Sequence, residues 1–411
     1  MITTKENKKC GLIGKKLGHS FSPLIHSKLA NYSYSLFEME ESELEAFIRD
    51  VDFCGVNVTI PYKVEVMKYL DFISPAAQQI GCVNTVIKRD GKTYGFNTDF
   101  FGLKYLIEKN GIEIKDADVL ILGTGGSSLT AKAVCSNMGA KSINFVSRSG
   151  DINYENVYSL FPDTEVIINT TPAGMYPKNG ECHIVLKKFE KLSGVVDIIF
   201  NPSKTKLLME AESLGVKHAN GLPMLVAQAK AACEIFIDEK ISDSEIDSIT
   251  KFIEDKTKNI VLVGMPGCGK SHIGRLVAKK LGRELIDTDE EIIKDAGMPI
   301  PEIFAKYGEE VFRKYEHDVI VRVSKLSGKV ISTGGGVVTR ENNYEPLHQN
   351  SKIIFIERDI SSLPTDGRPL SNINSLVSMY EKRLPMYKKF ADVTVKNDST
   401  PDVCCDKIIN S

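Results

Sequence analysis

The chain lacks the features that mark several large classes of protein. No apolar run among its 411 residues approaches the length of ~18 residues that a membrane-spanning helix needs. We therefore expect no membrane association. Residues 1–9 are polar and hold no apolar signal core, which predicts a cytoplasmic protein. Lys plus Arg number 52 and Asp plus Glu number 54, so the basic excess of a nucleic-acid-binding protein is missing.

Cysteine and histidine are also arranged without a pattern. The nine cysteines are scattered and form no Cys-x-x-Cys pair, which is typical of reduced thiols rather than of a disulfide scaffold. The seven histidines form no His-x-x-x-His cluster. The sequence therefore predicts no structural metal site.

The composition is that of an ordinary globular protein, with 42% hydrophobic and 26% charged residues. At ~150 residues per domain, the length predicts two or three domains. Short β-type runs alternate with helical patterns, which favours an α/β fold with largely parallel sheets. The predicted strands include residues 56–60, 119–122, 166–168, 195–200, 260–263, 330–332 and 353–356.

Residues 264–271, Gly-Met-Pro-Gly-Cys-Gly-Lys-Ser, fit the phosphate-binding pattern G-x-x-x-x-G-K-[ST] between a predicted strand and a predicted helix, residues 270–281. Backbone N–H groups of such a loop converge on a polyphosphate, Lys270 neutralises the β- and γ-phosphates, and the Ser271 hydroxyl holds Mg²⁺. The next strand ends in Asp287-Thr-Asp289. Strand alternation places both carboxylates on one side, one for Mg²⁺ and one for a substrate hydroxyl.

Residues 259–395 resemble shikimate kinase. The resemblance implies that Asp289 binds the substrate hydroxyls, that Asp287 assists Mg²⁺, and that Arg313 and Arg383 clamp the substrate carboxylate. It further implies a glycine triplet against the substrate ring, with Gly335 and Gly336, and a lid arginine, Arg368, on ATP. The ATP site would comprise Gly264, Gly267, Cys268, Gly269, Lys270, Ser271 and Arg368, and the metal site Ser271 and Asp287. Another small-molecule kinase of the same fold is the alternative.

A second glycine-rich turn, Gly123-Thr-Gly125-Gly126, follows the strand at residues 119–122 and precedes a predicted helix, residues 129–138. About 20 residues later, the next strand ends in Ser147-Arg148, where an NAD site would offer Asp or Glu. A hydroxyl and a guanidinium suit a 2′-phosphate instead. The sequence therefore favours NADP over NAD.

A lysine and an aspartate end two further polar strand patterns. Lys63 closes the segment 55–63, and Asp99 closes the segment 95–99. If the two meet in one cleft, the ammonium can protonate a carbonyl as a hydride arrives and take the proton back in reverse. We interpret them as a candidate catalytic pair.

Residues 9–238 resemble shikimate dehydrogenase, with a family catalytic pair at Lys63 and Asp99. The resemblance implies that Ser20 and Ser22 bind the substrate carboxylate and that Thr59, Asn84, Asn97 and Gln228 bind its hydroxyls. The implied NADP site comprises Gly123, Gly125, Gly126, Ser127, Ser147, Arg148, Asn169, Thr170, Gly221 and Met224.

Three departures from the family pattern stand out. Ser147 replaces the asparagine of Asn-Arg-Thr, and Phe200 stands where a tyrosine is common. The segment 149–163 is short, which predicts a reduced helix on that side.

We expect a bifunctional enzyme. The first domain, residues 1–256, would be a dehydrogenase with a substrate-binding α/β part (about 9–100 and 222–256) and a Rossmann-type NADP part (about 101–221). The second domain, residues 257–411, would be a P-loop kinase with a parallel sheet. A capping box at Ser242–Glu245 predicts a helix before a linker at residues 255–258. Together the two would reduce 3-dehydroshikimate with NADPH and phosphorylate shikimate with ATP and Mg²⁺. The alternatives are a ligand-sensing protein without chemistry, and a dehydrogenase for quinate or NAD; the oligomeric state stays open.

Overall fold

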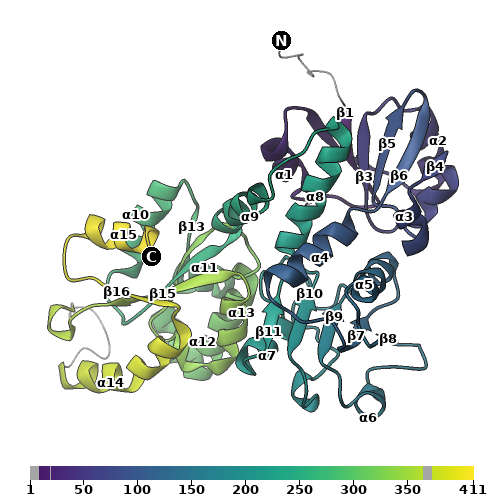
Figure 1. Cartoon of the computed structure of the whole chain (residues 1–411). Coiled ribbons are helices and arrows are strands. Elements are labelled where there is room, and N and C mark those ends of the chain that lie inside the picture. The colour runs from purple at the N-terminus through teal and green to yellow at the C-terminus, as the bar shows by residue number, and fades with distance from the viewer. Residues whose placement is uncertain (1–8, 19, 364–372) are drawn as a thin grey trace. The chain divides into compact units, whose positions relative to one another are not determined.

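The computed structural model describes residues 9–18, 20–363 and 373–411, and the chain forms two compact units, which meet in sequence between Phe252 and Ile253 (Figure 1). The α/β class and the parallel sheets predicted from the sequence are confirmed, as are all seven predicted strands. The predicted domain boundaries at 256 and 257 stay a prediction.

A six-stranded sheet of order β2-β1-β3-β5-β6-β4 opens the first unit. Its strands are β1 Lys9–Gly14, β2 Ser33–Glu38, β3 Gly55–Val58, β4 Phe72–Ile73, β5 Thr85–Arg89 and β6 Lys92–Phe96. β5 runs antiparallel to both β3 and β6, and the other neighbours are parallel. Its helices are α1 Ser22–Leu29, α2 Leu44–Asp50 and α3 Pro75–Ile80.

A fully parallel five-stranded sheet of order β11-β10-β9-β7-β8 follows. Its strands are β7 Asp118–Leu122, β8 Ser142–Val146, β9 Val166–Asn169, β10 Gly194–Asp197 and β11 Lys217–Ala219. The connecting helices are α5 Gly126–Asn137, α6 Val157–Leu160 and α7 Lys206–Ser213. The strand order reverses between β7 and β9, which is where open α/β sheets bind ligands. The four-residue α6 fits the reduced helix expected after Ser149.

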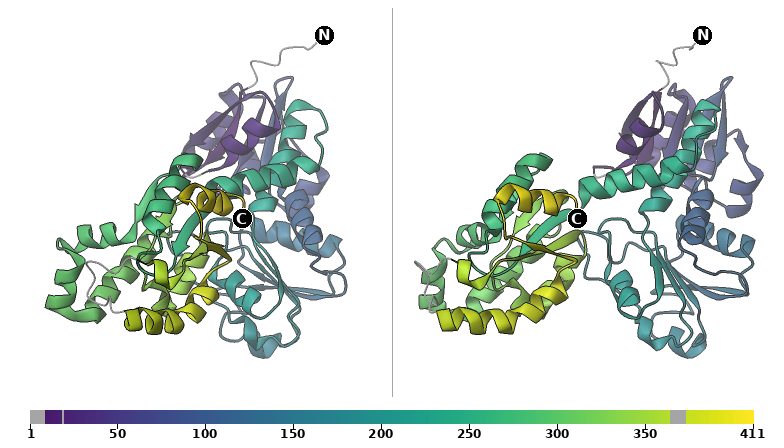
Figure 2. Two further views of the ribbon diagram at one scale, coloured as in Figure 1. Left: turned by 90° about the vertical axis from the view of Figure 1, so that its left-hand side faces the viewer. Right: turned by 60° about the vertical axis from the view of Figure 1, so that its left-hand side comes forward.

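Helices α4 Asp99–Lys109 and α8 Leu222–Ile237 lie side by side between these two sheets, as Figure 2 also shows. They approach closely at Gly102, where an added methyl group would lie 2.7 Å from the Met224 carbonyl oxygen and 3.2 Å from the Gln228 nitrogen. The missing side chain therefore lets α4 lie directly against the backbone of α8.

The second unit holds a parallel five-stranded sheet of order β13-β14-β12-β15-β16. Its strands are β12 Asn259–Val263, β13 Leu285–Asp287, β14 Val330–Ser332, β15 Ser351–Glu357 and β16 Val393–Lys396. Its helices are α10 Lys270–Leu281, α11 Thr288–Ala296, α12 Ile300–Val323, α13 Tyr344–His348, α14 Ile373–Phe390 and α15 Pro401–Ile409. α10 has the bounds predicted from the sequence.

Helix α9, Ser244–Thr257, continues through most of the stretch that we expected to be a linker. Most of the stretch 255–258 is therefore helical, since the backbone keeps helical hydrogen bonds up to Lys258, whose N–H donates to Glu254. That this stretch links the two domains stays a prediction. The predicted capping box is not formed: the helix begins at Ser244, the Ser242 hydroxyl accepts from the Ser244 N–H, and the Glu245 N–H donates to the Ser242 backbone carbonyl. Ile246, Ile249 and Ile253 lie at helical spacing and are buried, while Phe252 is half-buried.

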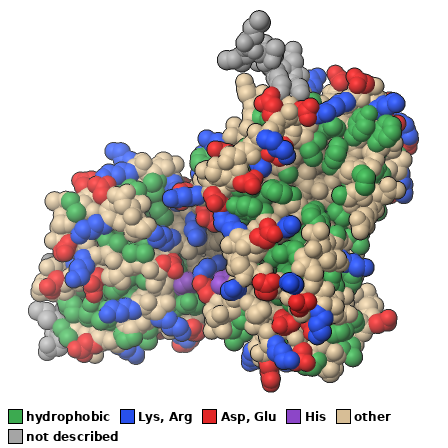
Figure 3. Space-filling model, viewed as in Figure 1, with side chains coloured by type: hydrophobic (Ala, Val, Ile, Leu, Met, Phe, Trp, Pro, Cys, Tyr) green, Lys and Arg blue, Asp and Glu red, His purple; other side chains and the backbone are tan. Residues whose placement is uncertain are grey.

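No helix in the described ranges is long and apolar enough to cross a membrane. On the face drawn in Figure 3, acidic and basic side chains are interspersed. This mixture agrees with the small net charge of −2.

Candidate functional sites

Lys63 and Asp99 meet in the first unit. The Lys63 ammonium donates to Asp99 Oδ2 over 2.6 Å, with 15% and 9% of the two side chains exposed. Lys63 lies in the turn after β3 rather than on the strand, since the strand stops at Val58 and Pro61 offers no N–H for pairing. Asp99 is the first residue of α4, where the helix dipole favours a carboxylate.

Three of the predicted hydroxyl-binding amides surround this pair. Asn84 Nδ2 donates to Thr98 Oγ1 over 3.0 Å and reaches Gln228 Oε1 at 3.5 Å. Asn97 Nδ2 donates to the Cys82 carbonyl, while Asn97 Oδ1 accepts from the Phe100 N–H in the first turn of α4. The structure thus brings together side chains from the residue before β5, from the two residues before α4 and from α8.

The two serines predicted for a carboxylate lie at the start of α1. Ser20 Oγ accepts from the Ser22 N–H over 3.2 Å, and Ser22 is buried. Thr59, the remaining predicted hydroxyl-binding residue, is half-buried and its N–H donates to the Ile13 carbonyl.

The glycine-rich turn of the first unit connects β7 to α5. Gly126 begins α5 beside the aliphatic part of Lys63, and Gly125 borders open space. Ser127, in the first turn of the helix, is half-buried. A dinucleotide phosphate on this helix N-terminus would therefore lie next to the Lys63–Asp99 pair.

Ser147 and Arg148 follow β8 on the neighbouring strand end, as predicted. Ser147 is half-buried and its N–H donates to the Ile152 carbonyl, whereas Arg148 is exposed. The predicted contact of this exposed guanidinium with a 2′-phosphate stays a prediction.

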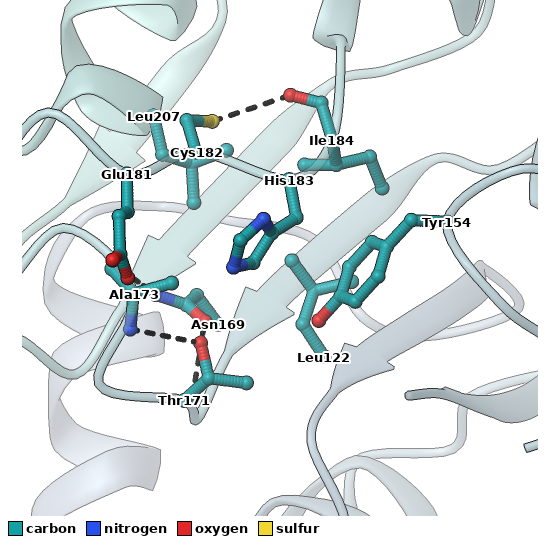
Figure 4. Close-up of a pocket in the computed structure, with 10 residues that line it drawn as sticks. All are labelled: Leu122, Tyr154, Asn169, Thr171, Ala173, Glu181, Cys182, His183, Ile184 and Leu207. Carbon is teal, nitrogen blue, oxygen red and sulfur yellow. Dashed lines mark hydrogen bonds between the residues drawn. The ribbon is translucent and has the colours of Figure 1, made fainter. Parts of the chain in front are cut away.

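Residues at and after the end of β9 line a pocket together with Leu122, the last residue of β7 (Figure 4). Thr170 Oγ1 donates to the Leu122 carbonyl over 2.6 Å, and Asn169 Oδ1 accepts from the Thr171 N–H and hydroxyl. Asn169 Nδ2 in turn donates to the fully buried Asp197 over 3.0 Å. Burial raises the pKa of the Asp197 carboxyl to about 7, against the opposite effect of its three hydrogen bonds.

Gly221 and Met224 stand at the beginning of α8. The Gly221 N–H donates to the Ile199 carbonyl just beyond β10, and Met224 is buried against α4. The start of α8 therefore borders the carboxyl end of the five-stranded sheet, where the other predicted cofactor residues lie.

The phosphate loop of the second unit lies between β12 and α10, as predicted. Gly267 and Gly269 have φ of 82° and 103°, left-handed values that favour glycine. The buried Lys270 ammonium donates to the carbonyls of Gly264 and Met265, each over 3.0 Å. Cys268, predicted to line the ATP site, is fully buried in the loop.

Ser271, the second residue of α10, is in contact with Asp287, the last residue of β13. Ser271 Oγ donates to Asp287 Oδ2 over 2.7 Å and lies 3.1 Å from Ser332 Oγ. One hydroxyl and one carboxylate suit Mg²⁺ that keeps its other ligands from water and nucleotide phosphates. No group of three or more histidine, cysteine or acidic side chains in the described ranges forms a self-contained metal site.

Asp287 and Asp289 do not share one side of an extended segment, so that expectation is wrong. β13 ends at Asp287, which caps α11: its Oδ1 accepts from the Asp289 N–H over 3.0 Å. Asp289 therefore lies in the first helical turn, and its buried Oδ1 has no hydrogen-bond partner. Burial and the neighbouring Asp287 raise the pKa of the Asp289 carboxyl.

The predicted arginine clamp and glycine triplet lie together. Gly336 abuts the Arg313 guanidinium, while Arg383 Nη1 donates to the Gly335 carbonyl over 3.0 Å. Arg368 lies outside the described residues. Two cationic groups thus face the segment that follows β14, as a carboxylate-binding site requires.

The sequence analysis missed several residues that support these sites. Glu316 is buried, pairs with Arg313 over 2.9 Å and leaves its Oε1 without a partner, close to Gly334 and Asp289. Tyr387 donates to the same Gly335 carbonyl as Arg383. Glu316 lies three residues after Arg313 and Tyr387 four after Arg383, a helical spacing that could have shown them.

Comparison with known families gives two matches. The family described as shikimate dehydrogenase substrate binding domain matches residues 12–86, and the family described as shikimate kinase matches residues 266–411. The first matched segment runs from within β1 to the second residue of β5, and the second begins within the phosphate loop.

Individual relatives match the first unit. An NADP(+)-dependent shikimate dehydrogenase of Clostridium beijerinckii is 37% identical over 268 residues, which cover 60% of this chain and 98% of the relative. Shikimate dehydrogenase 1 of Peptoclostridium difficile superposes with a TM-score of 0.56 at 36% identity, covering 60% of this chain and 98% of that one. A chorismate mutase/shikimate 5-dehydrogenase fusion protein of Clostridium acetobutylicum gives 0.58 at 39%, covering 61% and 98%.

Proposed function

The chain belongs to the shikimate dehydrogenase family through its first unit and carries a shikimate kinase domain in its second, and from this we propose that it catalyses two consecutive reactions. The first unit reduces 3-dehydroshikimate to shikimate with NADPH. The second transfers the γ-phosphoryl group of ATP to the 3-hydroxyl of shikimate. The product of the first reaction is the substrate of the second.

The observation that carries the dehydrogenase assignment is the Lys63–Asp99 pair beside the first turn of α5. NADPH supplies the hydride when bound. Lys63 donates a proton to the carbonyl oxygen of the substrate as the hydride adds to the carbonyl carbon, and takes it back in the oxidation. Asp99 holds the ammonium in place by a charge-assisted hydrogen bond.

The neighbouring polar residues orient the substrate. Ser20 and Ser22 bind its carboxylate, and Thr59, Asn84, Asn97 and Gln228 bind its hydroxyls. This assignment is supported by the contacts of Asn84, Asn97 and Gln228 beside the start of α4 and by the resemblance of all six positions to the family. Arg148 binds the 2′-phosphate and so selects NADP, a cofactor that the dehydrogenase relatives carry in their names.

The kinase assignment rests on the phosphate loop facing an acidic and a basic group of side chains. Lys270 and the loop N–H groups hold the β- and γ-phosphates, and Ser271 and Asp287 hold Mg²⁺. Asp289 accepts a hydrogen bond from the shikimate hydroxyl that attacks phosphorus. Arg313 and Arg383 pair with the substrate carboxylate through their planar forks.

One assay in two stages tests the proposal. Shikimate and NADP should give a rise in NADPH absorbance, and NAD or quinate in their place should give a much weaker one. ATP and Mg²⁺ added to shikimate should give shikimate 3-phosphate, detected by mass spectrometry. A chain that performs neither reaction would favour the ligand-sensing alternative.

A further inference from the structure

A continuous chain of hydrogen-bonded polar side chains runs through the core of the six-stranded sheet to the residue before α4. Its members are Tyr34 on β2, Asn57 on β3, Asn84 before β5, Thr85 on β5 and Thr98 before α4. All but Tyr34 are buried, and Thr85 has no exposed surface. Buried polar groups are costly unless they are paired, so a connected set of them in a sheet core needs a reason.

The hydrogen bonds of this chain run in one direction. The Tyr34 hydroxyl donates to Asn57 Oδ1 over 2.8 Å, and Asn57 Nδ2 donates to Thr85 Oγ1 over 3.2 Å. The Thr85 hydroxyl donates to Asn84 Oδ1 over 3.1 Å, and Asn84 Nδ2 donates to Thr98 Oγ1 over 3.0 Å. Each amide therefore meets an acceptor with its nitrogen and a donor with its oxygen.

Thr85 joins the two halves of this chain. Its single oxygen contacts Asn57, Asn84 and Thr98, the last at 3.1 Å. The Thr98 N–H also donates to Asn84 Oδ1, over 2.7 Å. The Thr85 hydroxyl and the Thr98 backbone thus fix the same amide oxygen, which turns the amide nitrogen of Asn84 towards Thr98 and Gln228.

We infer that Thr85 is a positioning residue of the dehydrogenase site, which acts through Asn84 and Thr98 and has no contact with the substrate. It holds the Asn84 amide in the orientation that receives a substrate hydroxyl, and it steadies Thr98, the residue before Asp99. The inference rests on the proposed dehydrogenase function, because that function makes Asn84 a substrate-binding residue.

The test replaces the hydroxyl of Thr85 by a methyl group of the same shape. Thr85→Val in the full chain should raise KM for shikimate at least fivefold, measured as NADPH formation without ATP, and leave KM for NADP within twofold. Thr85→Ser, which keeps the hydroxyl, should stay within twofold of the parent in both. The ATP-dependent phosphorylation of shikimate by the same preparations serves as a control for chain concentration and folding.

A purely structural role would behave differently. It would lower the melting temperature or the active fraction of Thr85→Val and leave KM for shikimate unchanged, and that result would overturn the inference. If Thr85→Val does not fold, Tyr34→Phe removes a hydroxyl at the far end of the same chain and should raise KM for shikimate about twofold or more; an unchanged KM would likewise overturn it. A parent chain without dehydrogenase activity would instead overturn the proposed function, and this inference with it.

Discussion

Lys63 Nζ lies 2.6 Å from Asp99 Oδ2, although 36 residues separate the two in the chain. The turn after β3 supplies the ammonium group, and the first residue of α4 supplies the carboxylate. The pair is mostly shielded from water, so the attraction between the two charges is stronger than on an open surface. The same turn brings Lys63 against Gly126 of the dinucleotide turn.

Lys63→Ala should lower the dehydrogenase kcat by roughly 10² or more, the usual scale for a positioned acid or base. Initial rates of shikimate oxidation measure this, and the kinase rate of the same variant should match the parent. A kcat within a few-fold of the parent would show that Lys63 has another role.

Lys270→Ala should abolish phosphoryl transfer and leave hydride transfer intact, because the ammonium that meets the phosphates is lost. Lys63→Ala is the matched control, since it removes a lysine from the other unit. Normal formation of shikimate 3-phosphate by Lys270→Ala would refute the kinase assignment.

Replacing Ser147 by Asp together with Arg148 by Ala should shift preference from NADP towards NAD. A carboxylate at this strand end repels a 2′-phosphate and accepts from a 2′-hydroxyl. The ratio of kcat/KM for the two cofactors is the measurement, and an unchanged ratio would argue against a role for Arg148.

His26 should make the first unit sensitive to acid. Burial lowers the pKa of this imidazole to about 3, while an unfolded histidine titrates near 6.5. Below about pH 6.5 the unfolded chain therefore binds a proton that the native chain does not. The contribution of His26 to the free energy of unfolding is fully present above that pH. It falls by about 1.4 kcal/mol per pH unit as the pH decreases towards 3.

His26→Gln removes this titration. Urea unfolding followed by circular dichroism, which suits a chain without tryptophan, should show a smaller loss of stability between pH 7 and pH 5 for the variant. The expected difference is about 2 kcal/mol, since only the interval below pH 6.5 contributes. Equal losses would mean that His26 is protonated in the native state.

A dehydrogenase fragment that ends at Glu239 should be less stable than one that ends at Lys256. The shorter fragment loses Asp247, which accepts from Tyr105 over 2.8 Å and pairs with Lys109, and Asp243, which pairs with the buried Lys230 over 2.6 Å. It also loses the buried Ile246, worth roughly 1.5–3 kcal/mol. Thermal melts of the two fragments decide this, and equal midpoints would show that α9 does not stabilise the first unit.

Local patterns predicted much of the fold. The apolar runs of β7, β12 and β15 can be recognised from the sequence alone. After β7 and β12, a glycine-rich turn and a helix follow directly in sequence, so these units can be recognised without knowing what they pack against. The bounds of α10 follow from the same pattern, with its first lysine fixed by the phosphate loop.

Other features depend on contacts between distant segments. Asp287 and Asp289 look like alternating strand residues until the capping bond of Asp287 is known. The bonds from Tyr34 to Asn57 and from Asn169 to Asp197 join different strands, so they follow from sheet register rather than from spacing. A polar residue in or beside an apolar run, such as Asn57 within β3 or Thr85 at the start of β5, was a local sign of the buried network.

The close approach of α4 to α8 at Gly102 fixes the distance between these two helices. α4 begins three residues earlier with the acid that orients the proton donor, and the helix it touches carries Met224 and Gln228, assigned to the cofactor and to the substrate. A methyl group at position 102 would lie 2.7 Å from the Met224 carbonyl oxygen and would push the two helices apart, because this oxygen belongs to the helical backbone of α8. The absence of a side chain at position 102 thus sets the distance between Asp99 and the residues of α8 that we propose to contact the cofactor and the substrate.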